Sequence, residues 1–450
     1  MILFLLGLTI SGDEGLNHWW REGYGDYTEN RFSINVAEKG IGVRLFSLLY
    51  MTPYAGDVRS WFWPAFEGKY RHLNFKVGCY HHTALEGLLL RMNQNNDFRI
   101  YRWMKGVYLK TDIKNLQITG FWGTPGNVNF NDFSYNIVND TTHLLMGLDG
   151  VFKLKPVKVT GGYIRLRDKG DLSAEAFTEM YGIGMDISLS IFEIFMNYIK
   201  KDGCRPVVGG RYSGEGYFGG LGFYLPLVSF QVFYEKYDSI GFGEGIYRYN
   251  DPPTITRSEY SINRGMDERG LGLVGNLSFG DYYIELNLAR IQTHDEFKVV
   301  EDHGLKIQKG DITFDYEYLY FRRFEPEVIN KAEQRTYLEW DYTFILPLQS
   351  IVRFNPVKAD TMRYYEYGYE MSGTIGDLSI TGSYERRTKR VSYLEDRTKW
   401  RKLELRWDRG NGFIMGIMLG EEKGGLVCSG GVCRWETPFR GVRFFLSKKI

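Results

Sequence analysis

The sequence predicts an all-β protein, a closed antiparallel barrel of long strands, and three observations lead to this fold class. Apolar and polar residues alternate through many segments of the chain. Between those segments, short turns alternate with long connections. The composition combines 33 Tyr, 30 Phe and 53 Gly with only 12 Pro, a mixture that is typical of strands and turns rather than helices.

The alternation is clearest in residues 311–321, whose sequence is DITFDYEYLYF. A period of two indicates a strand whose two faces meet different surroundings. The same period recurs in residues 227–237, 281–290, 337–346, 377–385 and 402–408. In the first of these segments one face carries Ile312, Phe314, Tyr316, Tyr318 and Tyr320, and the other carries Thr313, Asp315, Glu317 and Leu319.

The connections between these segments differ in length in a regular way. Short turns are expected near Pro156, Pro226, Gly280, Pro347, Gly376 and Gly410. Longer connections are expected at residues 168–176, 201–213, 238–268, 293–309, 321–334, 386–397 and 420–440. Short turns on one rim and long loops on the other are the arrangement of outer-membrane barrels, with the turns in the periplasm. A large soluble β-sandwich is the alternative, but it seldom shows this rhythm.

The predicted strands are long enough to cross a membrane. They run to about 9–13 residues, whereas a tilted membrane strand needs about 9–11 and a soluble sheet strand is usually shorter. Lipid offers no partner for an open edge, so the sheet must close. We expect about 16–22 strands, an even number typical of single-chain barrels, in the bacterial outer membrane.

We divide the chain into three parts. Residues 1–12, MILFLLGLTISG, are expected to be the remnant of a signal peptide or a first strand. Residues 13–30 are expected to be an N-terminal periplasmic segment, and residues 31–450 a single transmembrane barrel. The net charge of +1 gives no indication of a nucleic-acid partner, and no apolar run is long enough for a membrane-spanning helix.

The four cysteines and seven histidines offer little chemistry. In VCSGGVC, Cys428 and Cys433 flank a Gly-Gly tip, so we expect a disulfide there, with two free thiols as the alternative. In CYHH, alternation places Cys79 and His81 on one side and His82 on the other, which does not favour a metal site. We expect no metal, no cofactor and no enzymatic activity, because no His-x-Ser element or other nucleophile with a positioned base is evident.

Two stretches resemble a family of uncharacterised outer-membrane β-barrels. They are ALEGLLLRMNQNNDFRIYRWMKGVYLKT, residues 84–111, and YNDPPTITRSEYSINR, residues 249–264. This chain has Leu85-Glu86 where the family usually has Gly-Arg. The resemblance implies a fold and a location but no catalytic or ligand residues. The segment EGLLLR could fold into the lumen or form a plain wall strand.

Acidic residues dominate the polar face of the later strands. We expect this face to line a water-filled lumen and to favour cations, in a porin-like channel for small solutes. Alternatively, the charges brace the barrel in pairs with Arg406, Lys110 or Lys158. The predicted pore-lining residues are Glu285, Asp315, Glu317, Glu339, Asp341, Glu366, Glu370, Glu385, Glu404, Arg406 and Asp408.

Two other functions compete with the channel. One is a blocked barrel whose long loops bind an extracellular polymer or protein; the other is a barrel-borne hydrolase. Outer-membrane lipid is an expected partner in every case. The basic run Arg386, Arg387, Lys389 and Arg390 could meet anionic lipopolysaccharide, or could be a solvated loop tip.

Overall fold

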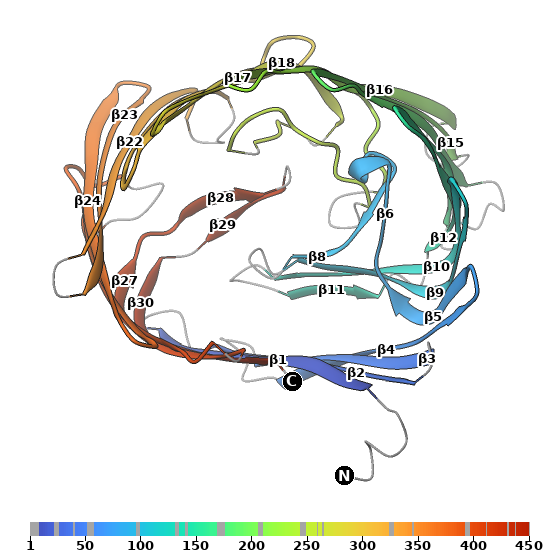
Figure 1. The fold of residues 1–450 in the computed structure, drawn as a ribbon, viewed down its shortest axis with the longest axis horizontal. Helices are drawn as coiled ribbons and strands as arrows, with labels where there is room; N and C mark the ends of the chain where they lie inside the picture. Colours follow the sequence, from blue (N-terminus) through green and yellow to red (C-terminus); the bar gives the residue numbers. More distant parts are fainter. Residues whose placement is uncertain are drawn as a thin grey trace.

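The computed structural model shows one closed β-barrel (Figure 1). It describes residues 9–21, 27–38, 41–51, 58–95, 100–130, 135–139, 143–168, 176–205, 210–243, 249–258, 260–262, 265–323, 328–343, 346–391, 397–410, 412–429, 432–436 and 438–449. Within these ranges, 24 strands form the wall, each antiparallel to the next.

The first half of the wall contains β1 (Thr9–Arg21), β2 (Tyr27–Glu38), β3 (Ile41–Met51), β4 (Val58–Tyr70), β5 (Leu73–Tyr80), β9 (Ile100–Ile113), β10 (Leu116–Phe130), β12 (His143–Leu154), β13 (Val157–Asp168), β14 (Phe177–Ser188), β15 (Phe192–Arg205) and β16 (Gly210–Tyr224). The second half contains β17 (Val228–Asp238), β18 (Asp267–Phe279), β19 (Tyr282–Gln292), β20 (Val299–Lys309), β21 (Ile312–Arg322), β22 (Asn330–Thr343), β23 (Pro347–Ala359), β24 (Met362–Ile375), β25 (Leu378–Arg387), β26 (Lys399–Asp408), β27 (Phe413–Glu422) and β30 (Phe439–Lys449).

The barrel closes where β1 pairs with β30, in a register that runs from Asp13 opposite Lys449 to Arg21 opposite Gly441. The predicted closed antiparallel barrel is therefore confirmed, although its 24 described strands exceed our range of about 16–22. Residues 13–30 are not a separate periplasmic segment where the structure describes them, because they lie in β1 and the start of β2. Residues 1–8 lie outside the described residues.

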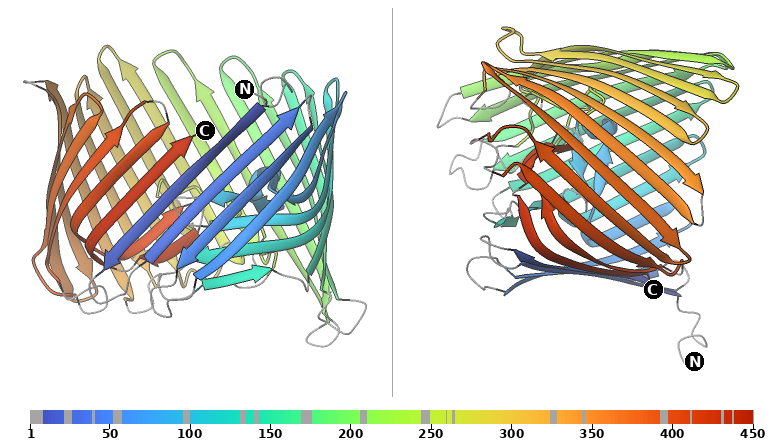
Figure 2. Two further views of the ribbon diagram at one scale, coloured as in Figure 1. Left: turned by 90° about the horizontal axis from the view of Figure 1, so that it is seen from below. Right: turned by 90° about the vertical axis from the view of Figure 1, so that its left-hand side faces the viewer.

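The two rims differ as the sequence predicts (Figure 2). All six predicted short turns join strands at one rim, where β1 begins and β30 ends. Gly280 and Gly376 lie in two-residue turns there with φ of +54° and +57°, a region that glycine reaches without steric cost. The opposite rim carries the long connections, except that Asp360 and Thr361 alone link β23 to β24. The long connection predicted at residues 293–309 is wrong in its second half, because residues 299–309 form the wall strand β20.

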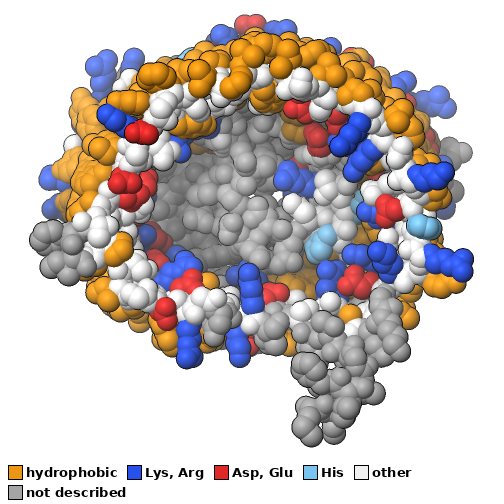
Figure 3. All heavy atoms as spheres, in the orientation of Figure 1, with side chains coloured by type: hydrophobic (Ala, Val, Ile, Leu, Met, Phe, Trp, Pro, Cys, Tyr) orange, Lys and Arg blue, Asp and Glu red, His pale blue; other side chains and the backbone are white. Residues whose placement is uncertain are grey.

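The outer face of the wall is apolar, and Figure 3 shows it as a nearly continuous hydrophobic band. On β19, Leu286 and Leu288 are each 39% exposed, whereas Ala289 and Ile291 on the other face are almost fully buried. The predicted outward and inward faces are thus confirmed on this strand. An apolar band around a barrel of this kind is the surface that faces outer-membrane lipid. In the described part of the chain, no helix is long and apolar enough to cross a membrane.

The hydrophobic core lies inside the barrel, because connections from the long-loop rim fold inward (Figure 1). The first inward segment, residues 81–95, contains β6 (His82–Ala84), the 3-10 turn η1 (Leu85–Gly87), β7 (Leu90–Met92) and β8 (Gln94–Asn95). The second inward segment lies between β17 and β18 and is described at residues 239–243, 249–258, 260–262 and 265–266. We call these two segments together the plug. A further hairpin of β28 (Gly425–Ser429) and β29 (Val432–Glu436) also lies within the ring, and β11 (Tyr135–Asn139) extends the pairing of β10.

Candidate functional site: the plugged lumen

The two stretches that carry the family resemblance meet each other inside the barrel. The amide of Asp251 donates to the carbonyl of Gly87 at 3.1 Å, and the Asn250 side-chain amide donates to the carbonyl of Leu88 at 2.9 Å. The segment EGLLLR therefore folds into the lumen and is not a wall strand. Leu88, Leu89 and Leu90 are all 0% exposed and form the centre of the apolar core.

A tight turn allows the first inward segment to approach the second. Leu85 and Glu86 have φ of 49° and 56°, and Gly87 follows with φ of 95°. A Cβ on Gly87 would lie 2.7 Å from the carbonyl oxygen of Asp251. Glycine is required at position 87 both for its backbone conformation and for this close approach.

A buried ion pair joins the plug to the wall. Arg102 on β9 donates to the carboxylate of Asp251, and each side chain is only 5% exposed. The neighbouring Asn250 is fully buried and accepts from the amide of Phe242 at 2.8 Å. Buried charges need such partners, because an unpaired charge away from water is costly.

The second inward segment binds to the acidic wall through Arg257. Its guanidinium donates to both carboxylate oxygens of Asp315, at 2.8 and 2.6 Å, and lies 3.8 Å from Glu285. This two-point geometry is the strong form of an arginine–carboxylate pair. The hydrogen bonds to Asp315 raise the pKa of Arg257 although burial opposes them, so the pair stays charged.

Adjacent residues of the same segment bind further carboxylates. The Ser258 hydroxyl donates to Glu317 at 2.5 Å, and the Ser258 amide donates to Asp302 at 2.9 Å. The carboxylate of Glu268 accepts from the amides of Ile262 and Gly265, at 3.0 and 2.9 Å. Sequence reasoning missed Asp302 and Glu268 as part of this site, since their inward phase alone does not reveal which loop covers them.

Lys423 anchors the base of the β28–β29 hairpin to the wall through ion pairs. Its ammonium lies 2.8 Å from Glu366 and 3.7 Å from Glu385. Arg387 also donates to Glu366 at 2.7 Å and is 2% exposed. The predicted basic run therefore does not lie wholly in a loop. Arg386 and Arg387 are the last two residues of β25, and the Arg387 side chain points into the barrel.

A second arginine braces the wall beside the hairpin. Arg353 donates to Glu370 and to Glu385, both at 3.3 Å.

In the hairpin, Cys428 and Cys433 are direct cross-strand partners in the backbone register. Their side chains lie outside the described residues, so the disulfide stays a prediction.

The remaining predicted residues have weaker partners or none. Glu339 accepts from the Gln349 amide at 2.8 Å, and Arg406 lies 3.4 Å from Asp408. Asp341 and Glu404 make no ion pair with any residue that the structure describes. Of the basic partners considered from sequence, Lys158 instead pairs with Asp186 on the neighbouring strand, and Lys110 lines a polar lumen cavity of about 260 Å³ beneath the first inward segment.

The histidine-rich stretch is structural. His82 bonds Asp149 at 2.6 Å in the same cavity, and His81 bonds the carbonyl of Arg102 at 2.8 Å. Burial lowers the pKa of His81, which favours its neutral form. Within the described ranges, no cluster of three or more His, Cys, Asp or Glu residues could hold a metal ion.

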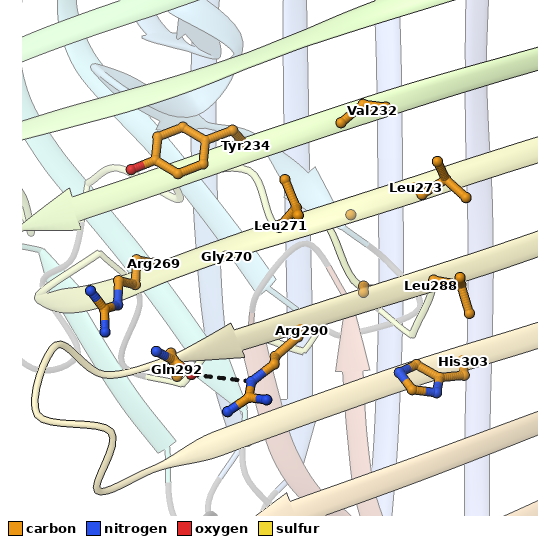
Figure 4. Close-up of a pocket in the computed structure, with 12 residues that line it drawn as sticks. Val232, Tyr234, Arg269, Gly270, Leu271, Leu273, Leu288, Arg290, Gln292 and His303 are labelled. Atoms are coloured by element: carbon orange, nitrogen blue, oxygen red, sulfur yellow. Dashed lines mark hydrogen bonds between the residues drawn. The ribbon is translucent and has the colours of Figure 1, made fainter.

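A cavity of about 630 Å³ lies on the outer wall and not in the lumen (Figure 4). Its apolar floor faces the lipid, so we assign it to lipid tails rather than to a solute. Arg269 and Arg290 stand at its loop-rim end, and each has an acidic partner, Glu296 at 3.1 Å and Glu301 at 3.4 Å. The apolar side chains shown are Val232, Tyr234, Leu271, Leu273 and Leu288.

Comparisons with known proteins add the architecture alone. No protein-family model and no curated protein sequence matches this chain. Among solved structures, Pseudomonas aeruginosa OccK11 (OpdR) is similar with a TM-score of 0.43 and 13% identity, over 84% of this chain and 96% of that chain. Pseudomonas aeruginosa OccK5 (OpdH) has a TM-score of 0.44 and 13% identity, over 84% and 98%. The P pilus usher (PapC) translocation pore has a TM-score of 0.48 and 9% identity, over 98% of both chains. Similarity at this level supports no functional conclusion, so the function is argued from the lumen.

Proposed function

We propose that the protein is an outer-membrane channel for small solutes whose lumen is narrowed by the plug. The observation that carries the proposal is the contrast between two sides of the lumen. The plug packs an apolar core against the side formed by β5 to β21. The side formed by β22 to β27 presents ion pairs and water-exposed carboxylates such as Asp341, which suit the passage of hydrated solutes.

Planar-bilayer conductance of the purified barrel tests this function. Stable ohmic steps are expected, with a unit conductance below that of an unplugged barrel of this width. The absence of any conductance under all conditions would favour the blocked barrel. The ion pairs by which Arg102 and Arg257 anchor the plug also support that alternative. In that case the long loops would be the functional surface, with a polymer or protein as partner.

The location has its own test. The mature chain is expected in the outer-membrane fraction, with altered mobility on unboiled gels because closed barrels resist detergent. Recovery as a monodisperse protein without detergent would contradict it. Membership of the uncharacterised barrel family, an export signal at the start of the chain and the absence of catalysis remain proposals that rest on the sequence.

A further inference from the structure

Five basic side chains form a band on the outer face of four adjacent strands, in the wall that faces the viewer in Figure 2, right. All five are exposed. They share the outward phase of exposed apolar neighbours such as Phe354, Tyr365 and Leu403. The band, which we call the basic belt, consists of Lys358 on β23, Arg363 on β24, Arg386 on β25, and Lys399 and Arg401 on β26.

Within the described part of the chain, the basic belt has no acidic partner. Among the described residues none forms an ion pair with any of the five, whereas Arg269 and Arg290 at the same rim are both paired. The register even places like charges opposite each other, Lys358 facing Arg363 and Arg386 facing Lys399. Like charges in direct cross-strand positions destabilise a sheet, so an anion bound between the opposed residues would stabilise this arrangement.

The depth of the basic belt identifies the source of that anion. Lys358, Arg363, Arg386 and Lys399 each lie within two residues of a strand end at the long-loop rim. Long loops are extracellular in barrels of this type, so the belt lies at the headgroup level of the outer leaflet. The side chains below it continue the lipid-facing surface, and Phe354 and Tyr365 stack there at 6.0 Å.

We propose that the basic belt binds a phosphorylated glycolipid of the outer leaflet. The two like-charged pairs would each hold a phosphate group, and the acyl chains would lie on the aromatic surface below. Arg386 and Arg401 are already positioned by the rings of Tyr367 and Tyr384, at 6.0 and 5.7 Å from the ring centroids. Those contacts leave guanidinium N–H groups free to donate to phosphate oxygens.

Binding of diphosphoryl lipid A to the purified full-length barrel in neutral detergent tests the proposal. The variant Arg363→Gln, Arg386→Gln, Arg401→Gln is expected to lose on the order of a hundredfold in affinity, since each basic residue near an anionic surface contributes roughly 1 kcal/mol. The matched control is Arg165→Gln, Lys200→Gln, Lys236→Gln, whose side chains are outward, near the same rim, and already paired. This control should bind lipid A within about twofold of the wild type.

A second measurement uses the wild-type barrel alone and so does not depend on the variant folding. Lipid A stripped of both phosphates should bind far more weakly than the diphosphoryl form, and added salt should weaken only the latter. Equal binding of the two lipids, or equal loss in the control variant, would overturn the proposal. Competition by millimolar inorganic phosphate or by an acidic polysaccharide as effectively as by lipid A would also overturn it. The channel function is not involved in any of these outcomes.

Discussion

Two pairs of inward carboxylates on adjacent strands have different surroundings. On β21, Asp315 and Glu317 lie beneath the second inward segment and are held by Arg257 and Ser258. On β22, Glu339 lies opposite Thr313, nearer the turn rim, and Asp341 is exposed. No part of the plug that the structure describes bonds to the second pair. Inward carboxylates on adjacent strands therefore have two roles. They bind the plug where an inward segment contacts the wall, and they stay solvated where no such segment contacts it.

The largest expected effect comes from removing a buried anchor. Asp251→Ala leaves the Arg102 guanidinium buried without its partner, which we expect to destabilise the plug by about 3–5 kcal/mol. Hydrogen exchange of residues 249–262 should accelerate strongly while the wall strands stay protected. Asp341→Ala is the control and should change neither. Uniform acceleration across the barrel would mean that the plug does not open separately from the wall.

The second-largest expected effect is the loss of stability caused by a charge on the outer face, and it tests whether the compared carboxylates face inward. Leu286→Arg places a charge against lipid and should cost about 2–4 kcal/mol if the site is near the midplane, measured by urea unfolding in lipid vesicles. Thr343→Arg, on the inward face near the turn rim, should cost little. Alternation also predicts an inward Asn287 and an outward Phe344. Asn287 is only 6% exposed and is therefore an unsuitable control, and Phe344 lies outside the described residues. Equal costs for Leu286→Arg and Thr343→Arg would show that the assigned faces are wrong.

Loosening the plug without breaking its buried core should change conductance. Arg257→Gln removes both bonds to Asp315 and leaves that carboxylate unpaired, at a cost of about 1–3 kcal/mol. Single-channel steps should become larger and noisier than those of the wild type. Arg290→Gln, on the outer wall, is the matched control. Unchanged steps in Arg257→Gln would indicate that the second inward segment is held by its apolar contacts alone.

Neutralising the solvated pair should alter selectivity and leave the size of the steps unchanged. Glu339→Gln with Asp341→Asn is expected to reduce cation preference at low salt, with the difference vanishing at about 1 M salt, where screening is nearly complete. Reversal potentials under a salt gradient provide the measurement. Asp315→Asn with Glu317→Gln should instead resemble Arg257→Gln. If both double variants shifted the reversal potential alike, the distinction between anchors and solvated charges would fail.

The smallest effect concerns Lys423 at the base of the hairpin. Burial lowers its pKa, but the carboxylates of Glu366 and Glu385 outweigh burial and raise it above 10.5. The ion pairs of Lys423 therefore stabilise the anchored hairpin at every pH below the pKa of lysine in the unfolded chain. This stabilisation is lost as the pH rises through the raised pKa of Lys423 in the folded protein. Conductance noise should therefore increase only in strongly alkaline solution, whereas Lys423→Gln should show that noise at pH 8. Noise that rises near neutral pH in the wild type would contradict this.

The sequence predicts the wall well and the lumen poorly, for a physical reason. Period-two alternation directly records which side of a strand meets lipid, so residues such as Leu286 and Asp315 are assigned to the right face. Alternation does not record how far a loop reaches into the barrel. The partner of Asp315 is 58 residues away in sequence, and that of Asp251 is 149 residues away. The predicted strand number is too low in part because residues 9–21, which form β1, are assigned to the signal-peptide remnant and the periplasmic segment.

The pairing of β1 with β30 has a consequence for the order of assembly. Every other wall pairing joins strands that are neighbours in the chain or are separated by one inserted loop, whereas this pairing spans from Asp13 to Lys449. Closing so long a loop carries the largest entropic cost of any pairing in the barrel, and contacts distant in sequence form slowly. We therefore expect the ribbon of strands to form first as an open, curved sheet with two unpaired edges. The inward segments would then fold onto the concave side of this sheet. The two edges would pair last and enclose the inward segments in the lumen.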